Sequence, residues 1–577
     1  MLLFQLPGLA KAAVILLAAA TTMAEGKIAR HAAAEKRTYP TSAIQWQPCP
    51  ADINTVAALD VECGVLTVPL DYTAPHSNET LDLSLVRVPA LKKPAKHSIL
   101  LNFGGPGAEA RHALAELSDM LQVVTGGEHD LITWDPRGTA ETLTFSCFDN
   151  TTIRTQFTSQ LGLGNASDVQ RGVIWAAGKN YADACANYPD AQKKAPIINT
   201  AFTARDAMQI VDAVEEDRLL RYWGFSYGTD LGATLAALFP ERAEKVLLDG
   251  VYTPNQYFYE RTDSQGFASA DDTFSEFFRQ CVATPEVCSL ARSHPNATAK
   301  QLESAAYDLI EELKYRPIPY NGAILGYSEL KIAIRFGLYA PGTWLEIDSI
   351  LNAFLTEPRN ETLAGETLGG YISLSLAAPV DDAGIGIECV DKAPRSNSFD
   401  VISASIDEAQ AVSRLLGDSL AALIATCAQW TLEPRERYMD GFAKVKPLKP
   451  LFVIGNTYDS ATSIKSARNF TETVKGSVLL EHGGVGHASI AQPSLCTARA
   501  IQAFFTNGTL PEPNTVCKTV TTPFKYAKFG PTWQDLFPQL GYELPKSNQT
   551  QAARARPRDS TEEAIKKLSR RSRGVVS

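Results

Sequence analysis

A serine, an aspartate and a histidine follow one another along this chain in sequence settings where each could take part in covalent catalysis. Ser226 lies within Gly224-Phe-Ser-Tyr-Gly228, a G-x-S-x-G sequence whose glycines permit a turn tight enough to expose the hydroxyl. A serine hydroxyl is a weak nucleophile until a histidine accepts its proton, and the histidine needs a carboxylate to fix its tautomer. Asp459 and His487 supply these groups in the order Ser, Asp, His. The three residues therefore predict acyl transfer through a covalent serine intermediate.

Two other residues are alternatives for the same roles. Asp249 also ends an apolar segment and could supply the acid, and His482 lies close to His487. His482 falls at the end of a predicted strand, whereas His487 lies in a glycine-flanked loop, so we expect His487 to be the base. H-E-x-x-H spacing, a P-loop and a dinucleotide fingerprint are all absent from the sequence, so we expect neither a metal nor a cofactor. The remaining histidines are His31, His76, His97, His112, His129 and His294.

The segments around these residues predict a mostly parallel sheet with helices on both faces. Apolar strand-like runs at 98–103, 130–134, 219–223, 245–249, 450–459 and 477–482 alternate with helical segments. Residues 46–90 alternate apolar and polar side chains, as antiparallel edge strands do. Each of the three candidate catalytic residues lies in a turn or loop after a predicted strand, at the edge of the sheet where α/β folds bind ligands.

A glycine-rich turn follows the predicted strand at 98–103. Its sequence, Gly104-Gly-Pro-Gly107, lets backbone N–H groups come close to a ligand, as an oxyanion-hole loop requires. We expect the N–H groups of Gly105 and of Tyr227, the residue after the serine, to hold the negative charge that develops on the substrate.

The distance along the chain from Ser226 to Asp459 is far more than one strand and one helix need. Residues 255–447 are rich in helical periodicity, and we expect them to form a cap inserted over the edge of the sheet that binds ligands. The core would then comprise residues 38–254 and 448–545.

The two ends of the chain have compositions unlike the rest. Residues 1–24 hold an apolar run at 12–20 and end in small residues, which predicts a signal peptide. The run is shorter than the ~20 residues of a transmembrane helix, so this reading is preferred to an anchor, and no span is expected in the mature chain. Residues 25–37 end in Lys36-Arg37 and are either a propeptide or a solvated linker, and residues 546–577 are predicted to be disordered.

Cysteines and sequons agree with secretion. An even number of cysteines without C-x-x-C predicts disulfides, and pairing of sequence neighbours is the simplest connectivity, although the sequence does not fix it. The ten are Cys49, Cys63, Cys147, Cys185, Cys281, Cys288, Cys389, Cys427, Cys496 and Cys517. N-glycosylation sequons lie at Asn78, Asn150, Asn165, Asn296, Asn360, Asn469, Asn507 and Asn548. We expect an extracellular glycoprotein, with the cell wall or a vacuole as alternative locations.

Composition limits the class of partner. With 577 residues, 45% of them hydrophobic and 20% charged, the chain can bury one elaborated globular domain or two. Its net charge of −10, with no basic block before the tail, argues against nucleic acid as a partner. A peptide or a small acyl compound is the expected substrate.

A set of motifs spread over both halves of the predicted core resembles one known family. The motifs are Trp46-x-x-Cys49, the run from Cys63 to Tyr72, Gly104-Gly-Pro-Gly107, Trp134-Asp-Pro-Arg-Gly138, Gly224-Phe-Ser-Tyr-Gly-Thr229, Cys427-x-x-Trp430, Gly486-His487 and the closing Cys496 to Cys517. Together they resemble the secreted tripeptidyl aminopeptidase branch of the proline iminopeptidase family, peptidase family S33.

The resemblance implies an α/β-hydrolase fold with an inserted helical cap and an exopeptidase that acts on free N-termini. It assigns Ser226 as nucleophile, Asp459 and His487 as its partners, and Gly105 with Tyr227 to the oxyanion hole. The chain departs from the family pattern at Phe103, where a histidine is usual, at Ser460-Ala-Thr462, and in the second glycine missing after Gly138.

An aminopeptidase must bind a free α-ammonium group, which a carboxylate can do. Glu388 and Asp391, on either side of Cys389, are the candidates because the resemblance resurfaces there; the alternative is ordinary solvated acids beside a disulfide. Two other functions stay open. One is hydrolysis of a small-molecule ester, lactone or amide by the same residues. The other is a non-catalytic binding protein, which the complete set of three residues disfavours.

Overall fold

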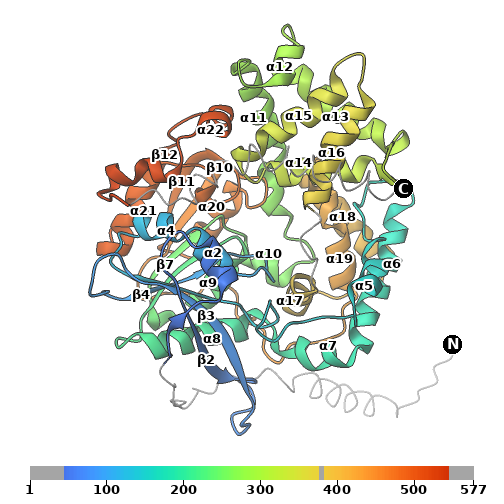
Figure 1. The fold of residues 1–577 in the computed structure, drawn as a ribbon. Helices are drawn as coiled ribbons and strands as arrows, with labels where there is room; N and C mark the ends of the chain where they lie inside the picture. The colour runs from blue at the N-terminus through green and yellow to red at the C-terminus, as the bar shows by residue number, and fades with distance from the viewer. Residues whose placement is uncertain (1–43, 376–381, 545–577) are drawn as a thin grey trace, which may run out of the picture. The chain divides into compact units, whose positions relative to one another are not determined.

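The computed structural model describes residues 44–375 and 382–544 (Figure 1). Contacts group the chain into Met1–Thr41, which lies outside the described residues, and Ser42–Ser577, which contains all of the described residues. The predicted signal peptide, propeptide and tail, with Asn548, lie outside the described residues.

Among the described residues, ten strands form one sheet in the order β1-β2-β3-β5-β4-β6-β7-β10-β11-β12. Antiparallel pairing joins β1 (Gln47–Pro48) to β2 (Glu62–Pro69), β2 to β3 (Thr80–Val88), and β3 to β5, its neighbour in the sheet. The other strands are parallel: β4 (Ser98–Asn102), β5 (Asp130–Trp134), β6 (Leu220–Phe225), β7 (Ala243–Asp249), β10 (Phe452–Tyr458), β11 (Val478–Val485) and β12 (Thr515–Lys518). The predicted mostly parallel sheet is confirmed, and β12 adds a strand that the sequence did not predict.

Helices cover both faces of the sheet, because apolar side chains of the central strands point to both faces. Tyr222 and Leu248 face a core shared with α8 (Thr200–Val214), α9 (Tyr227–Leu238) and α20 (Ile464–Thr473). Their neighbours Trp223 and Leu247 face the opposite core, shared with α3 (Arg111–Glu116), α4 (Ser118–Val124) and α21 (Leu495–Asn507). Because successive strand residues point to opposite faces, both faces are apolar and both are buried.

A helical insertion separates β7 from β10 along the chain (Figure 1). It contains α10 (Pro254–Tyr259), α11 (Ala270–Ala283), α12 (Ser289–Ser293), α13 (Ala299–Tyr315), α14 (Tyr327–Gly337), α15 (Trp344–Leu355), α16 (Glu361–Ser375), α17 (Ala383–Asp391), α18 (Phe399–Val412) and α19 (Ala421–Ala428), with the short hairpin β8 (Ile318–Tyr320) and β9 (Ala323–Leu325). Most of these helices share a separate hydrophobic core that also takes in Val485 at the end of β11 and Phe524 of α22 (Pro523–Phe529). The insertion therefore rests on the end of the sheet from which the predicted base emerges.

Five disulfides join cysteines that are neighbours in the sequence, and one of them ties α17 to α19 inside the insertion. The pairs are Cys49–Cys63, Cys147–Cys185, Cys281–Cys288, Cys389–Cys427 and Cys496–Cys517. No helix in the described part of the chain has the length and apolar character needed to cross a bilayer.

Candidate active site

Ser226 lies in a strained turn between β6 and α9. Its φ of 55° and ψ of −127° fall outside the regions that residues other than glycine usually occupy. Both flanking glycines are required by close packing. A Cβ on Gly224 would lie 2.2 Å from the carbonyl oxygen of Gly228, and one on Gly228 would lie 2.6 Å from that of Asn102. The serine N–H donates to the Asp249 carbonyl at 3.1 Å, which fixes the turn to the neighbouring strand.

Asp459 and His487 are brought together at the ends of the two strands that follow the insertion. The imidazole Nδ1 lies 3.2 Å and 3.1 Å from the two carboxylate oxygens of Asp459. The hydroxyl of Thr462 donates to Asp459 at 2.8 Å and lies 3.0 Å from the same Nδ1. With Nδ1 directed at the acid, the other ring nitrogen, Nε2, is left for a substrate or a nucleophile.

The surroundings of Asp459 keep it ionised although its side chain is fully buried. Burial alone would raise the pKa of this carboxyl group. The charge of His487, the hydrogen bond to it and the backbone N–H groups of Thr462 and Ala488 outweigh burial and lower the pKa below its usual value. An acid held as a carboxylate can stabilise the imidazolium that forms during catalysis.

The alternative acid and base have other partners. Asp249 accepts hydrogen bonds from the N–H of Ser489 at 2.8 Å and from its hydroxyl at 2.5 Å, and burial raises its pKa to about 6. His482 is completely buried, and its Nδ1 lies 2.9 Å from the hydroxyl oxygen of Thr497. Burial lowers the pKa of this histidine to about 4. Among the described residues, neither the Asp249 nor the His482 side chain forms a hydrogen bond with the turn that holds Ser226.

The glycine-rich loop after β4 packs directly on the nucleophile turn. A Cβ on Gly104, whose φ is 94°, would lie 2.8 Å from the Cβ of Ser226. The N–H of Gly104 is already bonded to the Asn102 side chain at 3.0 Å. The N–H groups of Gly105 and Tyr227 have no acceptor among the described residues, and Tyr227 is the first helical residue, whose N–H has no partner within the helix.

Helix α17 carries both acids that the sequence offered for an ammonium group, and they differ in their contacts. Asp391 accepts from the N–H and hydroxyl of Thr200 at 3.0 Å and 2.6 Å and from the hydroxyl of Tyr257 at 3.1 Å. Glu388 has a buried Oε2 without a hydrogen-bond partner in the described part of the chain. Burial, followed by the charge of Asp263, raises the pKa of Glu388 to about 8.

Two further buried acids act on Glu388, and sequence reasoning missed both. Asp230, one turn into α9 from the serine, is fully buried and neither carboxylate oxygen has a partner among the described residues. Burial and then the charge of Asp263 raise the pKa of Asp230 well above its usual value. The charge of Lys392, whose Nζ lies 3.8 Å from Asp263, acts in the opposite direction on the pKa of both Asp230 and Glu388. The i to i+4 spacing from Ser226 to Asp230 on a buried helix was the available signal.

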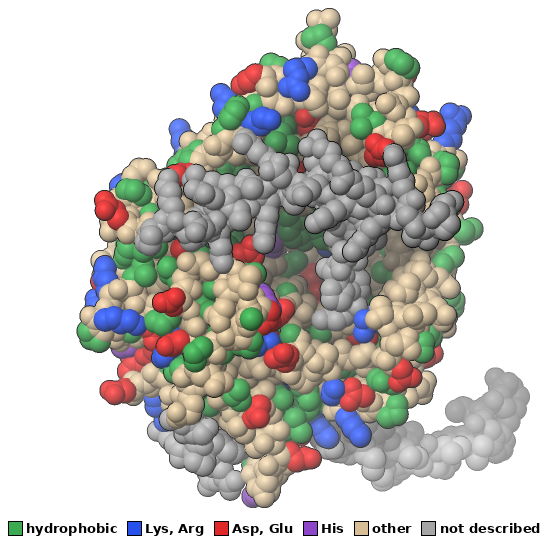
Figure 2. Space-filling view, in the orientation of Figure 1, with side chains coloured by type: hydrophobic (Ala, Val, Ile, Leu, Met, Phe, Trp, Pro, Cys, Tyr) green, Lys and Arg blue, Asp and Glu red, His purple; other side chains and the backbone are tan. Residues whose placement is uncertain are grey.

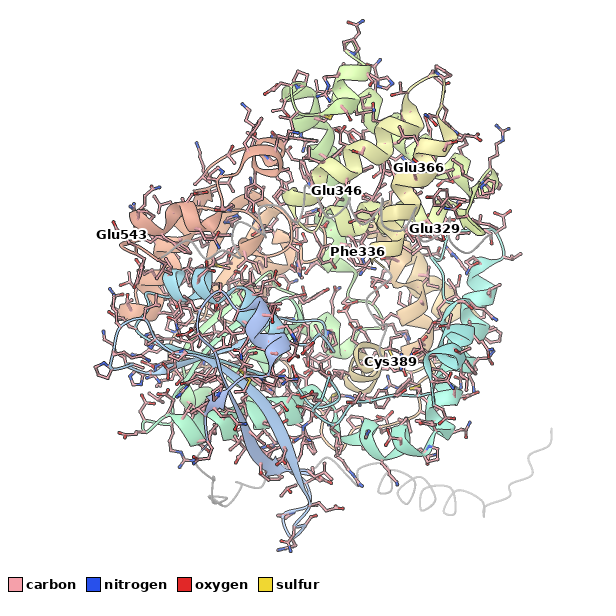
Figure 3. All side chains as sticks on the ribbon, viewed as in Figure 1. Glu329, Phe336, Glu346, Glu366, Cys389 and Glu543 are labelled. Carbon is pink, nitrogen blue, oxygen red and sulfur yellow. A yellow bond between two sulfur atoms is a disulfide. The ribbon has the colours of Figure 1, made fainter. Side chains whose placement is uncertain are left out.

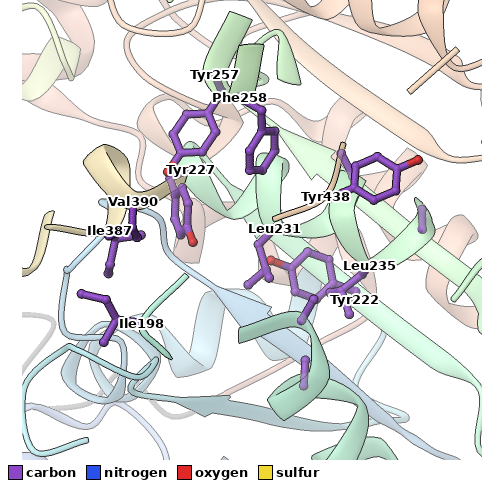
Figure 4. Close-up of a cluster of buried hydrophobic side chains, with 14 of the residues drawn as sticks. Ile198, Tyr222, Tyr227, Leu231, Leu235, Tyr257, Phe258, Ile387, Val390 and Tyr438 are labelled. Atoms are coloured by element: carbon purple, nitrogen blue, oxygen red, sulfur yellow. The ribbon is translucent and has the colours of Figure 1, made fainter. Parts of the chain in front are cut away.

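Helix α17 packs against both α9, the helix that follows Ser226, and the glycine-rich loop. Tyr227 of α9, Tyr257 of α10 and Ile387 and Val390 of α17 belong to one buried cluster, in which the two tyrosine rings lie 5.8 Å apart (Figure 4). A Cβ on Gly107 would lie 2.6 Å from the N of Gly384, at the start of α17.

A hollow opens near the centre of the molecular face drawn in Figure 2, with hydrophobic and acidic side chains around it. In Figure 3, the label on Cys389 marks α17 and the label on Phe336 marks the end of α14. Both helices belong to the insertion, and α17 packs on the glycine-rich loop at Gly384.

Sheet topology, a strained serine after a central strand, and an acid and a histidine after later strands define a serine hydrolase with the α/β-hydrolase fold.

Comparison with known proteins places the chain near one group of hydrolases. Residues 413–517 match the family model described as TAP-like protein. The chain is 26% identical over 508 residues to serine protease Hip1 of Mycobacterium tuberculosis, which covers 82% of this chain and 91% of that protein. It is 22% identical to the tripeptidyl aminopeptidase of Streptomyces lividans, over 86% of this chain and 90% of that protein. Carboxylesterase B of Mycobacterium tuberculosis is 24% identical, over 82% and 89%. The resemblance to tripeptidyl aminopeptidases is confirmed.

Proposed function

We propose that this protein is a secreted exopeptidase that releases tripeptides or other short peptides from free N-termini through an acyl-enzyme. His487 takes the hydroxyl proton of Ser226 on Nε2 as the oxygen attacks the scissile carbonyl, and Asp459 stabilises the imidazolium. The proton then passes to the leaving amine, and water completes the cycle by the same route. The N–H groups of Gly105 and Tyr227 would hold the oxyanion. The observations that carry the mechanism are the Asp459–His487 contact and the strained turn that holds the serine.

Recognition of a free N-terminus is assigned to Glu388. A buried carboxylate oxygen without a partner is stabilised by a cation, and a substrate α-ammonium group supplies one. Asp230 and Asp263 add negative potential around it. Asp391 is the poorer candidate, because three protein donors already occupy its oxygens. In this proposal the helical insertion is a cap. Its helix α17 would bind the N-terminus of the substrate through Glu388, and it packs on the glycine-rich loop through Gly384.

Secretion is supported by the five disulfides, since such bonds persist in oxidising compartments. Among the proposed glycosylation sites, Asn165 and Asn469 are half-buried, and the exposed ones are Asn78, Asn150, Asn296, Asn360 and Asn507.

A second candidate function is hydrolysis of a small-molecule ester, lactone or amide. The similarity to a protein named carboxylesterase B supports it, because the same serine, histidine and aspartate can transfer either kind of acyl group.

Ala-Ala-Pro-p-nitroanilide, its N-acetylated form and p-nitrophenyl butyrate separate the two candidates. The peptidase proposal expects cleavage of the free peptide and not of the acetylated one, with loss of all activity in Ser226→Ala. Cleavage of the ester alone would refute the peptidase and support the second candidate. Glu388→Gln should raise KM for the free peptide about tenfold or more, the scale of a charged hydrogen bond, and leave the ester unchanged. Glu366→Gln, an exposed acid on α16, is the matched control.

A further inference from the structure

Within the described part of the chain, the insertion contacts the proposed catalytic histidine through Tyr339, which follows the end of α14. The N–H of His487 donates to the carbonyl of Tyr339 at 2.7 Å. The phenol ring of Tyr339 lies 5.1 Å from the imidazole, centroid to centroid, with 69° between the two planes. A Cβ on Gly486 would come within 2.8 Å of the same carbonyl oxygen, so the two backbones are in direct contact.

The position of Tyr339 is set by the body of the insertion. The hydroxyl of Thr343 donates to the carbonyls of Gly337 and Ala340, each at 2.8 Å, which closes the turn around the tyrosine. Trp344 follows at once, is completely buried, and its ring lies 5.6 Å from that of Phe524. The turn is therefore held at both ends, and the ring beside His487 is positioned by packed structure.

The ring of Tyr339 packs against the group that carries positive charge in the proposed mechanism. Aromatic rings attract cations that lie over their faces within about 6 Å of the ring centre. Asp459 contacts His487, the charge of His487 lowers the pKa of Asp249, and the Tyr339 ring packs against the imidazole. Both acids lie on the core, whereas Tyr339 belongs to the insertion.

We propose that Tyr339 is a positioning residue for His487. The tyrosine ring orients the imidazole and stabilises the imidazolium formed in the acyl-transfer step. The proposal rests on the catalytic residues of the proposed function and not on its substrate. It makes the insertion part of the catalytic machinery as well as a cover for the substrate.

The test measures the rate at which a fluorophosphonate probe labels Ser226, as a function of pH. Tyr339→Leu removes the ring and keeps the backbone contact. We expect a labelling rate about three- to tenfold lower, and the acid limb of the profile moved to lower pH by about half a unit, because the neutral imidazole is then relatively favoured. Tyr339→Phe retains the ring and should stay within about twofold of the unchanged protein, with an unshifted profile.

Phe336→Leu is the matched control, since that half-exposed ring lies 6.0 Å from Tyr339 and has no contact with the histidine among the described residues. The proposal is overturned if Tyr339→Leu labels like the unchanged protein, if Tyr339→Phe loses as much as Tyr339→Leu, or if Phe336→Leu gives the same shift. His487→Ala should abolish labelling. If it does not, the proposed catalytic residues fail first, and this separates the two failures.

Discussion

Replacing Asp459 by asparagine tests the assignment of the acid with little change in size. One carboxylate oxygen accepts from the N–H groups of Ala461 and Thr462, both at 2.8 Å. The other accepts from the Thr462 hydroxyl at 2.8 Å and from the N–H of Ala488 at 3.0 Å. An amide has only one acceptor oxygen, so in either orientation its NH₂ group faces backbone donors. Such an amide cannot hold His487 as the carboxylate does.

The size of the effect follows from the tautomer of the histidine. With the carboxylate, the proton of neutral His487 is held on Nδ1, and Nε2 is free to accept the serine proton. An amide nitrogen beside Nδ1 favours the opposite tautomer, which cannot act as the base. In serine proteases this change costs about 10⁴ in turnover. That factor corresponds to about 5.4 kcal/mol of transition-state stabilisation.

The assay is turnover of the preferred p-nitroanilide or ester substrate, with the thermal midpoint measured beside it. The matched control is Asp249→Asn, which changes a second buried acid at a strand end that is bonded to Ser489 rather than to the histidine. We expect Asp249→Asn to keep turnover within about tenfold. If Asp459→Asn retains turnover to the same extent, or if Asp249→Asn loses as much as Asp459→Asn, the assignment of the acid is refuted.

Three further predictions concern pH and stability. KM for the free peptide should rise as pH falls below about 8, because Glu388, whose pKa is about 8, becomes protonated. KM for the ester should not change with pH in this way. If both KM values rise in parallel, Glu388 does not bind the ammonium group. Asp249 has a pKa of about 6 in the folded protein against about 3.9 unfolded, so its stabilising effect is present below pH 4 and is lost as pH rises through 6. Asp249→Asn should therefore raise the free energy of unfolding at pH 8 by about 2–3 kcal/mol, measured in urea, and a decrease would contradict this. Replacing Cys389 and Cys427 by serine opens a 38-residue link and should cost about 4 kcal/mol in the same assay, with KM for the peptide rising; an unchanged midpoint would count against it.

Local patterns were enough to predict the parallel sheet and the order of the candidate residues. Glycines around Ser226 predict a turn, and the apolar runs before Asp459 and His487 predict the strands β10 and β11, so each feature depends on a few consecutive residues. The edge strand β12 was missed because its four residues are partly exposed and have no long apolar run.

The surroundings of the site depend on contacts between distant segments, which periodicity does not encode. Asp230 is a single acid in an otherwise uncharged buried helix, and only the fold shows that Glu388 of α17 contributes to its raised pKa. Tyr339 reads as the end of a cap helix, and its contact with His487 joins positions that the sequence keeps far apart. Asp391 and Glu388 lie in one short helix, and only their partners distinguish the satisfied acid from the open one.

The separation of β7 from β10 by the whole insertion bears on how the chain folds. These two strands pair directly, with Leu248 beside Val453. In the sequence, however, the whole insertion separates them. Pairings this distant in sequence carry a large loop-closure entropy and slow the search for the native state. The insertion has a hydrophobic core of its own, which can condense locally and draw the two strands together. Substitutions in that core, such as at Trp344, would then slow refolding of the sheet as well as loosen the helices around it.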